Sequence, residues 1–261
     1  MNKNNFAYFG FVALPIILIL LGYLINLVAP PTLKFPNPWD ILKQLIELIG
    51  DQEVLEAIWV TIRALFKSLL LSLIIGICLG YFLGYNMKVW NSSQPTVDFF
   101  RSIPVTFLIP VSALLIGVND KNIIWLLSSY PGILVMIFSV RTGIMKQEPE
   151  RIHFFKIISG KNNFITRFFK VTFFETLPDL FSGFRIALSY GLVIVTVLEY
   201  MRLGNEMGLG GLVNDELERQ HYSNVYAFIL LIGIIGFILN KVTEIIQGKY
   251  IHWSNENSKS D

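Results

Sequence analysis

Long apolar runs alternate with shorter polar segments along the chain. About 20 apolar residues, rising about 1.5 Å each, cross the roughly 30 Å hydrocarbon core of a bilayer. The run at 104–118 is the weakest, because it is short and interrupted by Pro110, and it needs burial among neighbours or extension by the preceding segment. The pattern predicts an all-α membrane protein with six transmembrane helices, at about 6–28, 60–85, 104–118, 123–140, 180–201 and 225–246.

The N-terminal part carries two predicted elements. The uncharged run 6–28 is longer than the apolar region of a cleaved signal, so we expect it to be retained. Beyond it, Asn37 suits a helix N-cap, Pro38 suits the first helical position, and apolar residues recur at helical spacing as far as Ile49. We place this amphipathic helix on the external surface. No repeat or linker marks a second domain, so residues 1–261 are predicted to form one transmembrane domain.

Composition supports the membrane interpretation and excludes several chemistries. Hydrophobic residues make up 53% of the chain and charged residues 15%, with a mean hydropathy of +0.56, whereas soluble domains have about 25% charged residues. A net charge of +2 offers no basic field for nucleic acid, so no nucleic-acid partner is expected. One cysteine and three scattered histidines provide neither a disulfide nor metal-ligand spacing, so no metal site is expected.

The distribution of Lys and Arg predicts the orientation. Seven of them lie in the segment 141–170, and the alternate loops together carry thirteen against seven. Because positive loops stay cytoplasmic, both termini and the loop at about 141–172 are predicted to face the cytoplasm.

Small residues predict helix contacts in two runs. Gly76, Gly80 and Gly84 fall four apart on one helix face, and Gly183 and Gly191 repeat the spacing in the fifth run with Ala187 between them. Such faces let another backbone approach closely. They predict packing surfaces rather than an activity.

The loop at about 141–172 combines basic residues with phenylalanines such as Phe154 and Phe155. Its two halves can form short helices joined by a turn at 159–163, where Gly160 can adopt a positive φ. From the residues alone, two interpretations remain open. The loop either fills a groove on a soluble partner or lies against anionic lipid headgroups.

Two charged residues, Arg185 and Glu199, fall inside the fifth run. A charge at the centre of a membrane costs about 2.5–3.5 kcal/mol on insertion scales, so each needs a partner, water or a place near a helix end. Fourteen residues separate them, about 21 Å along a helix, so they cannot pair within it. A pathway or gating role and a structural interhelical hydrogen bond are both open for each residue.

Phosphate-binding motifs are missing from the sequence. Gly160-Lys161 lacks the upstream glycine and the hydroxyl of a phosphate-binding loop, and the glycines at 208–211 follow no predicted strand. We therefore expect no bound nucleotide and no cofactor in this chain.

A series of short fragments occurs in a fixed order along the chain: Arg101-Ser102-Ile103-Pro104, Pro110, Gly117-Val118-Asn119-Asp120-Lys121, Tyr130-Pro131, Thr142-Gly143, Leu177-Pro178, Gly183-Phe184-Arg185-Ile186, Glu199 and Gly208-Leu209-Gly210. With these fragments in this order, the sequence from Phe35 to about Gly236 resembles the permease subunits of ATP-binding-cassette importers, in the nitrate, taurine and aliphatic-sulfonate branch. The resemblance implies a MetI-like helical bundle, with Arg101, Pro104, Arg185 and Glu199 as candidates for the pathway or its gate.

The resemblance also implies a role for the cytoplasmic loop. In this family the loop holds a Glu-Ala-Ala and glycine motif that docks into the ATPase subunit. Gly160 matches the motif glycine, while Phe154-Phe155-Lys156 stands where Glu-Ala-Ala is found in the family. The candidates for coupling to the ATPase are Phe155, Lys156, Ser159, Gly160 and Lys161.

The implied function is that of a non-catalytic permease subunit of a bacterial inner-membrane importer for a small, anionic solute. Its implied partners are a second copy of the chain, two ATPase subunits that bind the ATP, an external substrate-binding protein and membrane lipid. A self-contained channel or ion-coupled carrier is the alternative, but Glu199 is the sole intramembrane acid for it. An intramembrane enzyme would need a nucleophile or metal motif that the sequence lacks.

Overall fold

The computed structural model describes residues 23–24, 36–147, 150, 154–155, 157 and 168–251. Its described elements are all helical, which confirms the predicted fold class. They are α2 (Pro38–Ile49), α3 (Gln52–Gly84), α4 (Met87–Ser102), the 3-10 helix η1 (Val105–Phe107), α5 (Leu108–Ile116), α6 (Ile123–Met145), the π-helix η2 (Phe168–Thr172), α9 (Phe173–Tyr200), α10 (Leu209–Glu218) and α11 (Tyr222–Tyr250).

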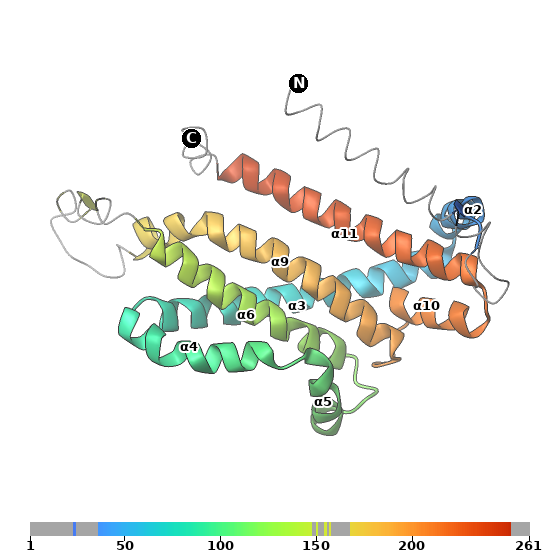
Figure 1. Ribbon diagram of the computed structural model, residues 1–261, viewed down its shortest axis with the longest axis horizontal. Coiled ribbons are helices and arrows are strands. Elements are labelled where there is room, and N and C mark those ends of the chain that lie inside the picture. Colours follow the sequence, from blue (N-terminus) through green and yellow to red (C-terminus); the bar gives the residue numbers. More distant parts are fainter. Residues whose placement is uncertain are drawn as a thin grey trace.

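Four described helices are long and apolar enough to cross a membrane. α3, α6, α9 with the preceding turn, and α11 overlap the runs that the sequence predicts at 60–85, 123–140, 180–201 and 225–246. In Figure 1 these helices lie lengthwise and side by side, with α2 and α10 near one end and the α3–α4 turn near the other. The predicted first span, 6–28, lies outside the described residues apart from Tyr23 and Leu24.

The third predicted span is short, as the sequence indicates. Residues 104–118 hold only η1 and α5, which together are too short to cross a bilayer by themselves. The preceding segment, which the sequence analysis offered as a possible extension, forms α4 and pairs with them at a bend of 76°, as a broken span or a re-entrant loop. A hydropathy search does not identify α4 as a membrane helix, because its composition is polar and Pro95 lies inside it. The helix packs against α3 and α6.

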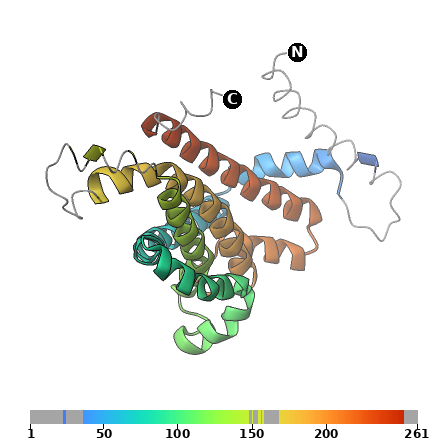
Figure 2. The same cartoon turned by 60° about the vertical axis from the view of Figure 1, so that its left-hand side comes forward.

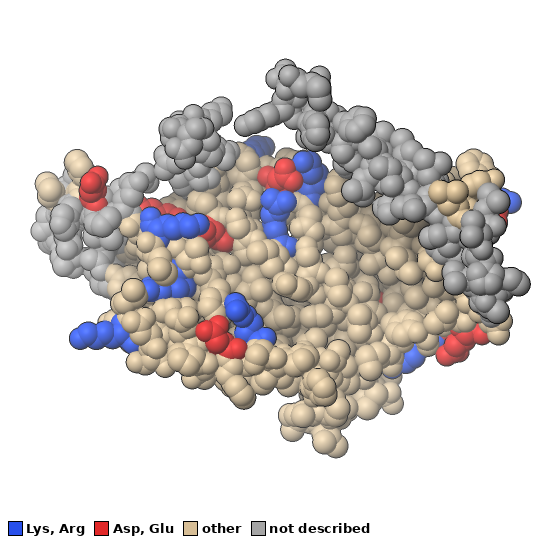
Figure 3. Space-filling model, viewed as in Figure 1, with Lys and Arg blue, Asp and Glu red and all other residues tan. Residues whose placement is uncertain are grey.

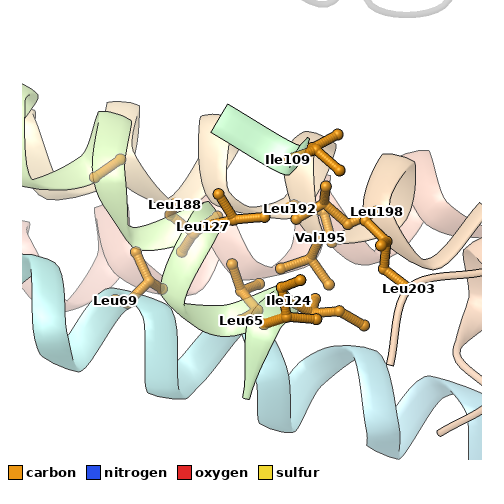
Figure 4. Close-up of a cluster of buried hydrophobic side chains, with 12 residues drawn as sticks. Leu65, Leu69, Ile109, Ile124, Leu127, Leu188, Leu192, Val195, Leu198 and Leu203 are labelled. Carbon is orange, nitrogen blue, oxygen red and sulfur yellow. The ribbon is translucent and has the colours of Figure 1, made fainter. Parts of the chain in front are cut away.

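The core of the bundle is the contact of α3, α6 and α9. Leu65 and Leu69 of α3 meet Leu127 of α6 and Leu188 and Val195 of α9 in one buried cluster, shown in Figure 4. Apolar packing of this kind gives no hydrophobic gain in lipid, so close approach and good fit must hold the helices together.

Glycines provide that close approach between α3 and α6. A Cβ on Gly76 would lie 2.9 Å from the carbonyl oxygen of Ile133, and one on Gly80 would lie 2.7 Å from the Cβ of Val140. Gly84 continues the same face, with Arg141 as its neighbour. The three predicted glycines therefore line one helix contact.

The glycines of α9 face two different helices. A Cβ on Gly183 would overlap Ser139 of α6, and one on Gly191 would lie 2.9 Å from a methyl group of Leu65 on α3. The absence of a side chain at both positions allows α9 to pack closely against α6 and α3.

Arg141 joins the ends of α3 and α6. Its side chain is buried, its Nη1 donates to the carbonyl oxygen of Gly84 at 2.7 Å, and its guanidinium lies 5.5 Å from the centre of the Trp90 ring. A positive charge at the last carbonyls of a helix is favourable. Arg141 thereby fixes the turn from α3 into α4.

α2 has the predicted N-terminus and apolar face. The side chain of Asn37 accepts from the backbone N–H of Trp39 at 3.0 Å, and Pro38 occupies the first turn. Ile41 and Leu48 are buried in a cluster that includes residues of α11, and Figure 2 shows α2 near the end of that helix. α2 thus adds a surface helix to one end of the bundle.

We expect Gly76→Ala and Gly80→Ala each to lower the free energy of unfolding by about 1–3 kcal/mol, because the added methyl group overpacks the contact of α3 with α6. Gly233→Ala on α11 is the matched control, since nothing lies within 4 Å of its added Cβ and alanine favours a helix. Thermal unfolding in detergent measures the difference. Equal melting temperatures for the three variants would contradict the glycine contact.

Candidate functional site

A groove of about 580 Å³ opens between α4, α6 and α9. Its walls are two stripes of side chains spaced four residues apart, one on α6 and one on α9, which is the spacing of a single helix face. The end of α4 and the start of η1 complete the groove. The stripes consist of Tyr130, Leu134, Phe138 and Thr142 on α6 and Ser182, Ile186, Tyr190 and Ile194 on α9.

Pro104 shapes the groove without lining it. Proline restricts the residue before it to extended conformations, and Ile103 has φ −78° and ψ 116°. α4 therefore stops at Ser102, and the chain bends into η1 and α5, which projects from the bundle in Figures 1 and 2. The hydroxyl of Tyr130 donates to the carbonyl oxygen of Phe100 and holds this end of α4 against α6.

Arg101 brings a positive charge into the groove. Its guanidinium carbon lies 4.9 Å from the centre of the Phe138 ring, and both residues line the groove. Asp98, one helical turn earlier, is 3.9 Å from a guanidinium nitrogen, and both side chains are substantially exposed. An exposed pair at this distance contributes little, so the guanidinium keeps donors for a ligand.

Asp179 is the acidic residue among those that line the groove. Its carboxylate lies 2.6 Å from the Nζ of Lys146, so its charge is offset by an ion pair between α9 and the C-cap of α6. Arg101 therefore sets the electrostatic character of the groove. On the face shown in Figure 3, charged side chains are sparse, and several of the basic ones lie beside acidic ones.

Arg185 faces a neighbouring hollow between α9 and α11. Its guanidinium lies 3.6 Å from a carboxylate oxygen of Glu244, and the amide of Asn240 donates to the hydroxyl of Ser189 at 3.0 Å. Ser182, Ile186 and Tyr190 line both hollows, so the α9 stripe separates Arg185 from the groove. Arg185 thus has an interhelical partner and lies outside the groove that holds Arg101.

Glu199 is buried at the α10 end of the bundle. Its carboxylate accepts from the hydroxyl of Thr61 on α3 at 2.9 and 3.0 Å and from the backbone N–H of Gly210 at 3.1 Å. The Thr61 hydroxyl oxygen in turn accepts from the N–H of Leu209 at 3.0 Å. These bonds satisfy the N-terminus of α10, where a negative charge is favourable.

The glycines at the start of α10 make this arrangement possible. A Cβ on Gly208 would overlap the Glu199 carboxylate, and a Cβ on Gly210 would lie 2.7 Å from the backbone nitrogen of Tyr200. Glu199 therefore joins α9, α3 and α10 and does not line the groove. The sequence analysis did not identify Thr61 as the partner of Glu199, because 138 residues separate the two positions.

Most of the coupling candidates lie outside the described residues. Of the five, only Phe155 is described, with a half-buried side chain. Lys156, Ser159, Gly160 and Lys161 lie outside the described part of the chain. The helices before and after this loop, α6 and α9, are both walls of the groove.

Residues 72–250 match the family model described as "Binding-protein-dependent transport system inner membrane component". A probable ABC transporter permease protein of Brucella melitensis is 21% identical over 229 residues, which cover 87% of this chain and 90% of that protein. The taurine transport system permease protein TauC of Escherichia coli is 24% identical over 238 residues, or 89% and 84% of the two chains.

The fold is similar to that of a chain in the inward-facing structure of the MetNI methionine ABC transporter. The TM-score is 0.63, with 18% sequence identity, and the match covers 74% of this chain and 94% of the other.

We expect Glu199→Ala to loosen α10, because each hydrogen bond to a charged group contributes about 1.5–3 kcal/mol. Hydrogen exchange of the Leu209 and Gly210 amides should become faster in Glu199→Ala. In Glu199→Gln the exchange rate of these amides should lie between the rates in Glu199→Ala and in the natural protein. Glu218→Gln, at the other end of α10 and exposed, is the control. Unchanged exchange in Glu199→Ala would show that the carboxylate does not hold the helix.

Proposed function

Since the chain belongs to the family of binding-protein-dependent transport system inner membrane components and is the translocation subunit of an ABC importer, we propose that the groove between α4, α6 and α9 forms part of the path of a small anionic solute. The family match confirms the resemblance that the sequence indicates, and the MetNI match confirms the permease fold. The permease performs no covalent chemistry in this proposal. ATP is bound and hydrolysed by partner subunits.

The observation that carries the proposal is the position of Arg101. Its guanidinium stands in a groove with mostly apolar walls, while the groove's carboxylate, Asp179, is neutralised by Lys146. The Arg101 side chain is exposed to solvent, and a cleft whose uncompensated charge is positive raises the local concentration of anions. The taurine permease relative supports an anionic or zwitterionic solute.

The connection to an ATPase follows from the ends of α6 and α9. Besides the Lys146–Asp179 ion pair, the side-chain amide of Gln147 donates to the carbonyl oxygen of Thr172 at 3.2 Å, so these two ends are tied together. We place the ATPase contact on the loop between them, at Phe155, Lys156, Ser159, Gly160 and Lys161. Movement of this loop would shift two walls of the groove together, as alternating access requires.

The other partners are assigned to the remaining surfaces. We place an external substrate-binding protein at the α2–α10 end and a second copy of this chain over the open side of the groove. Leu114 and Leu115 of α5 are 89% and 81% exposed and offer apolar surface to that copy. Exposed residues of α3 and α11, such as Phe82 and Phe237, face lipid in a bacterial inner membrane, with both termini cytoplasmic.

An ion-coupled carrier fits the structure less well. Such a carrier uses carboxylates that bind and release the coupling ion along the pathway. Glu199 is instead hydrogen-bonded to Thr61 and α10, and Asp179 is ion-paired. Within the part of the chain that the structure describes, the groove therefore offers no unpaired carboxylate for that purpose.

We expect Gly160→Pro and Gly160→Glu each to reduce the rate of ATP-driven uptake at least about tenfold and to leave membrane insertion intact. Either substitution disrupts the turn that we assign to ATPase docking, whereas the spans are untouched. Uptake into vesicles that contain the permease, its ATPase and its binding protein measures the loss.

Gly248→Glu on α11 is the control for the added charge, because nothing lies within 4 Å of a Cβ at this position. Its uptake should match that of the natural protein. Normal uptake by the two Gly160 variants would instead remove Gly160 from the coupling contact.

A further inference from the structure

We propose that the hollow between α9 and α11, of about 470 Å³, is a binding site for one anionic phospholipid of the leaflet at the Tyr250 end of α11. The lipid phosphate would contact Arg185, and the acyl chains would lie on apolar residues of both helices farther from that end. The site neighbours the proposed solute path, and it does not depend on which solute is transported.

Arg185 has hydrogen-bond donors that no described residue uses. The nearer carboxylate oxygen of Glu244 is 3.6 Å from a guanidinium nitrogen, which is too long for a hydrogen bond. The other oxygen of the same carboxylate is 3.0 Å from the Nζ of Lys241. Within the part of the chain that the structure describes, the Arg185 side chain makes no hydrogen bond. Its planar donors are therefore available, and they match the oxygens of a phosphate.

The balance of charge at the hollow favours an anion. Arg185 and Lys241 share one carboxylate, that of Glu244, so the three side chains together keep a positive charge. The other polar groups that line the hollow are neutral, namely those of Ser182, Ser189, Tyr190 and Asn240. Basic pockets between membrane helices on the cytoplasmic side are typical sites for anionic headgroups, and the proposed orientation places the Tyr250 end on that side.

The charged residues lie near the depth of lipid phosphates. α11 has 29 residues and is therefore about 44 Å long, which exceeds the hydrocarbon core of roughly 30 Å. Glu244 is about 9 Å along the helix from Tyr250, close to the border between hydrocarbon and headgroups. Long basic side chains at this border extend toward the headgroups.

Both helices carry a face that changes from charged to apolar with distance from the Tyr250 end. Spacings of three and four residues place each set on one side of its helix. The apolar members of the two sets are 39–58% exposed. The sets are Arg185, Ser189, Val193 and Val197 on α9, and Glu244, Lys241, Phe237, Ile234 and Leu230 on α11. A phospholipid has the same division, with a charged head and apolar chains.

The contact between α9 and α11 closes the hollow toward the middle of the membrane. A Cβ on Gly236 would lie 2.9 Å from a methyl group of Leu192, so the helices touch there, and they lie side by side in Figures 1 and 2. Asn240, one turn nearer to Tyr250, lines the hollow and donates to Ser189. The head therefore has an enclosed position, and the chains extend over the outer surface.

The test is native mass spectrometry of the permease purified with its ATPase, delipidated in detergent and titrated with phosphatidylglycerol or phosphatidylcholine of the same chain length. Phosphatidylglycerol should bind at least about fivefold more tightly, because only this lipid has a net negative charge. Inorganic phosphate alone should not displace the lipid, since it lacks the acyl chains.

Two variants of opposite effect assign the binding to this hollow. Arg185→Gln should weaken phosphatidylglycerol about fivefold to tenfold through loss of the charged contact and leave phosphatidylcholine unchanged. Glu244→Gln removes the competing carboxylate and should strengthen phosphatidylglycerol about twofold to fivefold. General damage to the fold would weaken binding in both variants.

Arg63→Gln on α3 is the matched control and should leave both affinities unchanged. The Arg63 side chain is 37% exposed, as is that of Arg185, and it also pairs with a glutamate, Glu206. Equal affinity for the two lipids, displacement by inorganic phosphate, or the same loss in Arg63→Gln as in Arg185→Gln would overturn the inference. If Arg185→Gln changes the dimer equilibrium but not the lipid preference, the second copy fills the hollow and the inference is likewise wrong.

Discussion

The close contact between α3 and α6 is the constraint on which the rest of the structure depends. Gly76 and Gly80 let the two backbones approach until side chains of α6 touch the α3 backbone. Inside a membrane, burial of apolar surface gives little driving force, so such fit must provide the association. With α6 fixed in this way, its opposite face presents the stripe that forms one wall of the groove.

Each end of the bundle has a polar connection that ties several helices together. At one end Glu199 joins α9 to α3 and to the start of α10. At the other end the Lys146–Asp179 ion pair joins α6 to α9, and Arg141 fixes the turn from α3 into α4. Both connections therefore involve helices that form walls of the groove.

The sequence and the structure differ most at α4. Hydropathy identifies membrane helices by their average apolarity, and α4 has a polar composition with a proline inside it. Its role becomes visible only when it packs against α3 and α6 and brings Arg101 to the groove. The resemblance to known permeases implied Arg101 and Pro104 among four candidates for the pathway or its gate. In the structure Pro104 bends the chain and Arg101 lines the groove.

The sequence by itself determined the helical membrane fold, four of the long spans, the N-terminus of α2 and the family, because apolar length, capping residues and ordered motifs are local properties of the chain. Only the tertiary structure decided that Glu199 is a structural connection to Thr61 and α10, that Arg185 pairs with Glu244, and that Arg101 is the charge in the groove. Each of these outcomes depends on contacts between helices that are distant in sequence, and helix periodicity specifies which residues share a face but not which face meets which neighbour.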